Sequence, residues 1–232
     1  MDQTEEQMST SRDVVLGRIR NGLQRTDMEE TLAVRRVGHT LASAEPNLVP
    51  ARGSGDLEER IATFTGMARA VLTDVRRIAA WHELPALVGQ YLREHNLPQK
   101  LVMAPDEALD RAGWDSQPLL RIRRDTAADA DTTGVTLAEA GVAETGTLCL
   151  ASSDRRPTLL AFFPETSIVV LPAADVVASY EEALERYSAR HDAPPRSINF
   201  VTGPSRTGDI GQKLELGAHG PRRLLVVLID EA

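Results

Sequence analysis

The sequence predicts an α/β protein in which helices cover both faces of a mainly parallel sheet. From about residue 56 onward, strand-length apolar runs alternate with helix-length segments, and this alternation is typical of parallel sheets. Hydrophobic residues make up 42% of the 232 residues and charged residues 26%, a composition that can form a buried core. We therefore expect an N-terminal helix and arm over residues 1–55, followed by an α/β domain over residues 56–232.

The N-terminal part is expected to contain one amphipathic helix, over residues 12–23, because its apolar residues recur at helical spacing. Those apolar residues are Val15, Leu16, Ile19 and Leu23. Residues 25–56 show little periodicity and end in a segment with several Pro and Gly residues. We interpret this second stretch as an arm that packs on the body of the protein or on a partner subunit.

The first half of the α/β domain begins with a helix that Asp56 is expected to cap, since its carboxylate can accept a hydrogen bond from a backbone N–H of the first turn. Ile61, Phe64 and Ala68 are expected to face inward from this helix. The expected elements are a helix over 57–71, a strand over 75–78, a helix over 84–95, a strand over 100–103, a short helix over 106–111 and a strand over 119–123.

The second half starts with a polar loop over 125–133, followed by strand signals over 134–150 that Gly141 and Gly146 interrupt. Thr145-Gly146 can turn a hairpin because glycine tolerates a positive φ. The remaining expected elements are a strand over 167–171, a helix over 174–190, a strand over 197–201, a helix-length segment and a strand over 224–229.

Composition excludes several functional classes. The net charge is −8 and no basic block occurs, so nucleic-acid binding, which requires neutralisation of phosphates, is not expected. No apolar run approaches the length of a membrane span, and we expect a soluble, cytoplasmic protein without a membrane partner. Cys149 is the one cysteine, and an iron–sulfur cluster needs about four thiolates. We interpret Cys149 as an inert thiol in a buried strand rather than a nucleophile.

The most informative segment is the polar loop Gly203–Asp209, which follows the strand-like run 197–201. If it leads into a helix, its backbone N–H groups and the hydroxyls of Ser205 and Thr207 can bind an anion. The alternative is a plain helix cap, in which Asp209 favours the helix dipole. The two interpretations are compatible, and the spacing does not match a phosphate loop that ends in Gly-Lys-Ser/Thr.

Two further residues are candidates for chemistry. Glu144 lies beside a glycine after a strand and can act as a base or nucleophile, or can merely fix its turn by binding backbone N–H groups. His219, within Gly217–Pro221, can bind substrate or move a proton, or can simply bond a neighbouring loop. We expect Glu144, Asp209 and His219 to converge at strand ends of one sheet. The other histidines show no metal-ligand spacing with His219, so no metal site is predicted.

Together these segments resemble the LUD (lactate utilization) domain family. The matching residues are Ala143–Leu148, Gly203-Pro204-Ser205, Thr207, Asp209-Ile210, Gly217 and His219-Gly220-Pro221. The resemblance implies a fold similar to that of glucosamine-phosphate deaminases, ribose-phosphate isomerases and CoA transferases, with a small antiparallel hairpin inserted on the sheet. The resemblance does not supply a reaction. We take Glu144, Asp209 and His219 as the candidate catalytic residues, and Thr145, Gly146, Gly203, Pro204, Ser205, Thr207 and Gly220 as the candidate ligand-binding residues.

Three functions stay open at this point. The resemblance implies an accessory or substrate-handling subunit in oxidation of L-lactate to pyruvate, which binds a small anionic ligand while partner subunits carry the iron–sulfur clusters. The chain has no cluster ligands and no Gly-x-Gly-x-x-Gly fingerprint, so it is expected to bind no such cofactor alone. The alternatives are a stand-alone enzyme acting on a CoA ester, folate or sugar phosphate, with Glu144 as nucleophile, and a purely structural interaction module. Whether the chain catalyses a step or forms homo-oligomers is left open.

Overall fold

The structure is a computed structural model that describes residues 11–23, 27–43, 49–207 and 215–231. Its contacts divide the chain into two compact units, residues 1–48 and 49–232. In the first unit, α1 (Ser11–Leu23) confirms the expected helix. A second helix, α2 (Asp27–Ser43), occupies much of the stretch that we interpreted as an arm without periodicity. Its exposed apolar residues do not form a single stripe along the helix, which is why the sequence pattern missed it.

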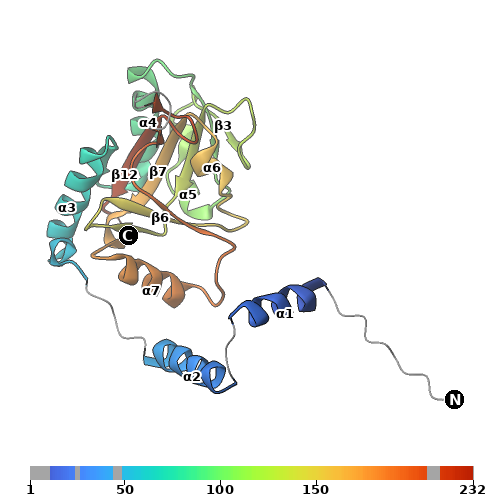
Figure 1. Cartoon of the computed structure of the whole chain (residues 1–232). Helices are drawn as coiled ribbons and strands as arrows, with labels where there is room; N and C mark the ends of the chain where they lie inside the picture. Colours follow the sequence, from blue (N-terminus) through green and yellow to red (C-terminus); the bar gives the residue numbers. More distant parts are fainter. Residues whose placement is uncertain (1–10, 24–26, 44–48, 208–214, 232) are drawn as a thin grey trace. The chain divides into compact units, whose positions relative to one another are not determined.

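The second unit contains the α/β domain (Figure 1). Its α-helices are α3 (Leu57–Ala70), α4 (Leu84–Glu94), α5 (Glu107–Asp110), α6 (Leu159–Phe162) and α7 (Tyr180–Arg190), and its 3-10 helices are η1 (Ala51–Gly53), η2 (Trp81–Glu83), η3 (Trp114–Ser116) and η4 (Ala173–Asp175). Its strands are β1 (Asp74–Ile78), β2 (Lys100–Met103), β3 (Arg121–Arg124), β4 (Thr133–Leu137), β5 (Ala140–Val142), β6 (Thr147–Ala151), β7 (Thr166–Pro172), β8 (Val176–Val177), β9 (Ile198–Val201), β10 (Arg206–Thr207), β11 (Glu215–Leu216) and β12 (Arg223–Ile229).

Six strands form the expected parallel sheet, in the order β1-β12-β7-β4-β2-β3. Every pair in this sheet is parallel, which confirms the α/β fold. Because successive side chains of a strand point to opposite faces, β12 supplies Leu225, Val227 and Ile229 to one core and Leu224, Val226 and Leu228 to the other. The sheet is therefore buried on both faces, as parallel sheets are.

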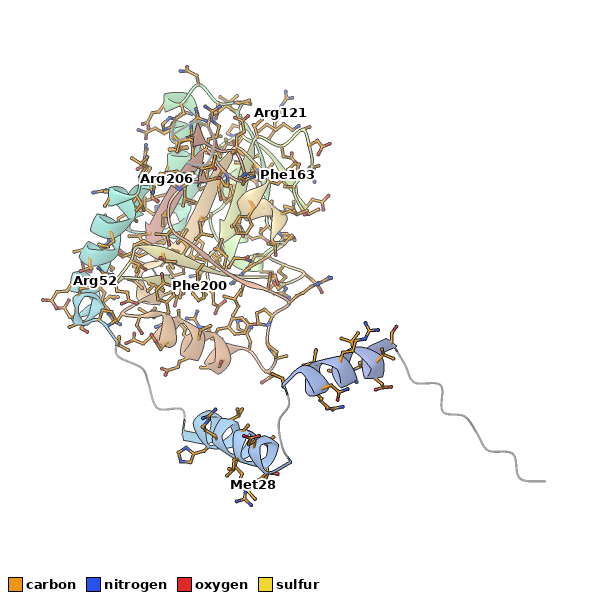
Figure 2. All side chains as sticks on the ribbon, in the orientation of Figure 1. Met28, Arg52, Arg121, Phe163, Phe200 and Arg206 are labelled. Atoms are coloured by element: carbon orange, nitrogen blue, oxygen red, sulfur yellow. The ribbon has the colours of Figure 1, made fainter. Side chains whose placement is uncertain are left out.

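The two faces are covered in different ways. One face packs against α4 and against Leu109 and Trp114, which lie between β2 and β3. The other face packs against α3 and against a second sheet, with the order β8-β5-β6-β9. A third core lies between that second sheet and α7, so side chains fill the space between successive layers (Figure 2). Asp56 caps α3 as expected, through a capping box with Glu59.

The second sheet is larger than the expected hairpin insertion. Strands β5 and β6 do form an antiparallel hairpin, and Gly146 at its turn has a φ of +66°. Strand β9 pairs antiparallel with β6, so the run 197–201 belongs to this sheet and not to the parallel one. Strand β8 pairs in parallel with β5. We predicted that the loops carrying Glu144, Asp209 and His219 all flank strands of one sheet, and this prediction is therefore wrong.

Two other expectations need correction. The helix predicted over 174–190 begins only at Tyr180, because Ser179 caps it and the preceding β8 is paired in the second sheet. The loop after β9 leads into β10, which pairs antiparallel with β11, where a helix N-terminus was expected. The remainder of that expected helix, residues 208–214, lies outside the described residues. Within the described part of the chain, no helix has both the length and the apolar character needed to cross a bilayer.

Replacing Gly146 by Ala is expected to destabilise the domain more than replacing Gly113, although both have a φ of +66°. The left-handed conformation alone costs an Ala about 1–2 kcal/mol at either position. A Cβ on Gly146 would also overlap the backbone of Met67 and Ala68 in α3, whereas a Cβ on Gly113 meets open space. Urea denaturation of both variants measures the difference, and equal losses of unfolding free energy would contradict it.

Candidate functional site

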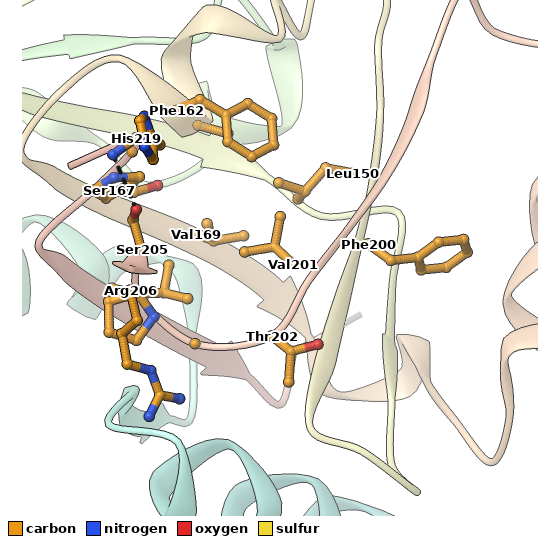
Figure 3. A pocket seen from close by; sticks show the side chains of 16 residues that line it. Leu150, Phe162, Ser167, Val169, Phe200, Val201, Thr202, Ser205, Arg206 and His219 are labelled. Carbon is orange, nitrogen blue, oxygen red and sulfur yellow. Dashed lines mark hydrogen bonds between the residues drawn. The ribbon is translucent and has the colours of Figure 1, made fainter. Parts of the chain in front are cut away.

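A pocket of about 300 Å³ opens where β9 and the two glycine-rich loops meet the starts of β7 and β12 (Figure 3). Its apolar wall includes Leu150, Ala161, Phe162, Val169, Val201 and Leu224. The polar side chains that line it are Ser167, Thr202, Ser205, Arg206 and His219. None of the described lining residues carries a carboxylate. The pocket therefore combines an apolar wall with hydrogen-bond donors, an arrangement suited to a small ligand with an anionic end and an apolar end.

The two loops are bonded directly to one another through Ser205. The Ser205 N–H donates to Pro221 O at 2.8 Å, and Gly217 N–H donates to Ser205 O at 2.9 Å. The Ser205 Oγ also accepts from His219 N–H at 3.3 Å. Because the Ser205 N–H already donates to Pro221 O, it is not available to an anion in the way that the anion-binding hypothesis required. Any contact of Ser205 with a ligand would therefore come from its side chain.

Three of the polar side chains gather at one end of the pocket. In Figure 3, His219, Ser167 and Ser205 lie together at this end, whereas Arg206 extends away from them. The Arg206 guanidinium donates to Val71 O at 3.2 Å, at the end of α3. Ser167 is 1% exposed, and its Oγ has no hydrogen-bond partner among the described residues. A buried hydroxyl without a partner is costly, and a ligand in the pocket would supply one.

A cluster of hydroxyl groups connects the hairpin turn to this pocket. The Thr147 Oγ1 lies 2.6 Å from Thr202 Oγ1 and 2.7 Å from Thr145 Oγ1. The Tyr180 hydroxyl lies 3.0 Å from both Thr145 and Thr147. Thr145 is thus linked to the pocket-lining Thr202 through Thr147, and it does not line the pocket itself. Ser167 and Tyr180 were not singled out from the sequence, because a hydroxyl residue within an apolar strand or a helix carries no local signature. Thr147 and Thr202 belong to segments that we singled out, but no role was assigned to either residue.

The predicted site residues separate into two groups. Those that line the pocket are His219, Gly203, Pro204, Ser205 and Gly220. Those that do not line it are Glu144, Thr145, Gly146 and Thr207. Asp209 lies outside the described residues. The structure therefore brings together the glycine-rich loops and His219, without Glu144.

Glu144 is buried elsewhere in the second sheet. It is 4% exposed, its N–H donates to Ala178 O at 3.3 Å, and its backbone and Cβ lie against Gly53. Its Oε2 has no hydrogen-bond partner within the described part of the chain. A group this buried and apart from the lining of the pocket is poorly placed to attack a ligand held beside His219.

Comparisons with known proteins agree with this architecture. A family model described as the LUD domain matches residues 61–229. A lactate utilization protein C from Geobacillus thermodenitrificans is 31% identical over 181 residues, which cover 77% of this chain and 69% of that protein. One from Bacillus licheniformis is 34% identical over 101 residues, and this match spans only 42% of either chain. A crystal structure of a DUF162 family protein from Deinococcus radiodurans aligns with a TM-score of 0.59 at 22% identity, over 76% of this chain and 99% of that one, which supports the fold alone.

Cys149 is expected to be unreactive in the folded protein. Burial in β6, with a smaller effect of the Glu139 charge, raises the pKa of its thiol to about 11. Since the thiolate is the nucleophile, raising the pKa by about two units lowers the reactive fraction near neutral pH about 100-fold. Reaction with a chromogenic disulfide at pH 8, with and without urea, measures this difference. Rapid stoichiometric labelling of the folded protein would contradict it.

Proposed function

This chain belongs to the LUD domain family, and we propose that it acts in lactate utilization as a subunit that binds a small carboxylate. The names of its relatives suggest the process, because several of them are lactate utilization proteins C. The pocket suggests the role. The observation that carries the proposal is the buried, unpartnered Ser167 hydroxyl beside Ser205 and His219, in a pocket whose described lining holds no carboxylate.

Lactate and pyruvate have the shape that this pocket favours. Each has a carboxylate that accepts hydrogen bonds and a methyl group that prefers an apolar surface. The hydroxyls of Ser167 and Ser205 and the imidazole of His219 can donate to the carboxylate, while Phe162 and Val169 can contact the methyl group. The volume of about 300 Å³ is at the small end of the range for ligand pockets, as a three-carbon acid requires.

The proposed oxidation also requires partners. Converting lactate to pyruvate breaks one C–H bond at the hydroxyl-bearing carbon and the O–H bond of its hydroxyl group. Two electrons and two protons leave in total, and an acceptor must take the electrons. One cysteine cannot hold an iron–sulfur cluster, which is bound by about four thiolates. We therefore assign the electron-accepting clusters to partner subunits, and to this chain the handling of the carboxylate.

The alternative, a stand-alone transferase in which Glu144 attacks a CoA ester, has less support. Its nucleophile would have to reach a thioester carbonyl, and Glu144 is 4% exposed and does not line the pocket. The third hypothesis, a purely structural module, does not account for a pocket lined by an unpartnered buried hydroxyl. Binding measurements separate these possibilities.

Replacing His219 by Ala is expected to weaken binding of L-lactate or pyruvate about 10- to 100-fold, because a hydrogen bond to a charged group contributes about 1.5–3 kcal/mol. Calorimetry measures the affinity, and a thermal shift reports the same loss, since a ligand that binds only the folded state stabilises it. His82→Ala is the matched control, because His82 is also exposed but lies outside the pocket. If neither acid binds the wild-type protein, the pocket serves another ligand or a partner interface.

Replacing Ser167 by Ala is expected to separate stability from binding. Removing a buried hydroxyl without a partner should leave the unfolding free energy unchanged or raise it by about 1 kcal/mol. The same change should weaken carboxylate binding about tenfold. Thr166→Val is the control, because the Thr166 Oγ1 is also buried without a partner but does not line the pocket. Equal affinities of the two variants would remove Ser167 from the binding site.

A further inference from the structure

A second pocket, of about 430 Å³, lies at the opposite end of the parallel sheet. It opens beside Asp106 and Glu139, which follow the carboxyl ends of β2 and β4. From β2 the chain continues to β3 through residues that pack on one face, and from β4 it continues to β7 through strands that pack on the other face. Adjacent strands whose connections depart to opposite faces form a topological switch point, and in open α/β sheets ligands bind at such points.

Arg156 bonds both Asp106 and Glu139 and so holds these two acidic residues of the crevice together. Its Nε donates to Asp106 Oδ2 at 2.6 Å and its Nη1 donates to Glu139 Oε2 at 3.0 Å. The Glu139 side chain, which is 3% exposed, also contacts His191 Nε2 at 3.3 Å and Arg190 Nη1 at 3.5 Å. These bonds fix a buried carboxylate and a guanidinium side by side at the wall of the pocket.

If this network served only to support the fold, it would do so at a high cost in desolvation free energy. Burying charged groups costs several kcal/mol for each ion, and well-packed apolar residues of similar volume often stabilise a protein as well or better. The sheet around Glu139 already has extensive apolar cores on both faces. A fixed, charged crevice at a switch point therefore fits recognition of a polar ligand better than support of the fold.

The charges of the crevice indicate the class of ligand. Three acidic residues line it, Asp106, Glu139 and Asp154, together with Arg155 and Arg156. Arg190 also contacts Glu139, but it bonds Asp175 as well, and Arg155 pairs with Glu107. Because positive charge is not in excess among these residues, the crevice gives no net attraction to an anion. Carboxylates only accept hydrogen bonds and guanidinium groups only donate them, whereas a hydroxyl does both. Neighbouring hydroxyls therefore complement this wall without adding charge.

We propose that this crevice is a second binding site, distinct from the His219 pocket, and that it takes a neutral polyhydroxylated ligand such as a monosaccharide. The aromatic wall fits the same ligand. His191 lines the pocket and stacks on Tyr187 with ring centroids 4.2 Å apart and planes 24° apart. A ring held flat in this way offers a surface to the C–H face of a sugar, while the charged wall bonds its hydroxyls.

The test is calorimetric titration of the full-length protein with D-ribose and D-glucose at millimolar concentrations, with inorganic phosphate as the anionic probe. We expect at least one sugar to bind, and Glu139→Gln to weaken its binding about tenfold or more because a charge-assisted acceptor is lost. Asp154→Asn is the second variant, since Asp154 is exposed at the pocket and its substitution does not disturb the buried network. It should also weaken binding, whereas Asp129→Asn, at an exposed position outside the pocket, should not.

Three outcomes would overturn the proposal. The first is that no sugar binds the wild-type protein, and the second is that binding survives in Asp154→Asn and in folded Glu139→Gln. The third is that phosphate binds in place of the sugars and binds more tightly to Asp154→Asn, which would identify an anion site. His219→Ala should leave sugar binding unchanged, so failure of this proposal and failure of the carboxylate proposal are distinguishable.

Discussion

Strands β7 and β12 carry apolar side chains on both faces, and the rest of the domain is arranged to keep water from both. Each buried Val, Leu or Ile contributes about 1.5–3 kcal/mol, so neither face can be left open. The α4 side covers one face, while α3 and the second sheet cover the other. Both pockets form at the edges of the second sheet, β8-β5-β6-β9. The loop after β9 lines the His219 pocket, and the loop after β6 lines the crevice beside Glu139.

The two pockets differ in how they are built, and this difference sets their chemistry. At the amino ends of β7 and β12, two loops are joined by backbone bonds to Ser205, and the polar side chains remain available to a ligand. At the carboxyl ends of β2 and β4, buried carboxylates and arginines hold one another in place. Under the two proposals, the first arrangement takes a small anion, whereas the second, in which positive charge is not in excess, takes a ligand rich in hydroxyl groups.

Local patterns were sufficient to predict most elements of the fold. The Asp56 cap, the glycine at the hairpin turn and the apolar runs of β7 and β12 each carry a signal within a few neighbouring residues. The sheet to which β9 belongs could not be predicted, because its run of residues looks the same in either sheet and only long-range pairing decides. The helix α2 was missed because its apolar residues form no single stripe.

The site was predictable only in part, for the same reason. Glycine-rich loops are recognisable in a sequence, and the two that we singled out, with Gly203–Ser205 and His219, do line one pocket. Ser167 has no such signature, because one hydroxyl in an apolar strand is unremarkable until a pocket is found beside it. The Glu139 network joins residues that are 17 to 52 positions apart, and no local pattern reports contacts over such separations.

The final turn of α3 has a consequence that reaches beyond packing. Gly146 in the hairpin turn lies against the backbone of Met67 and Ala68, and Gly203 in the pocket loop lies against Val71 O. Arg206 bonds the same Val71 carbonyl. One helix end therefore serves as the common foundation of the turn and the loop. If the pocket takes a ligand as proposed, its shape depends partly on residues that the ligand never touches. We therefore expect that a change at this helix end can alter ligand preference while every pocket-lining residue stays the same.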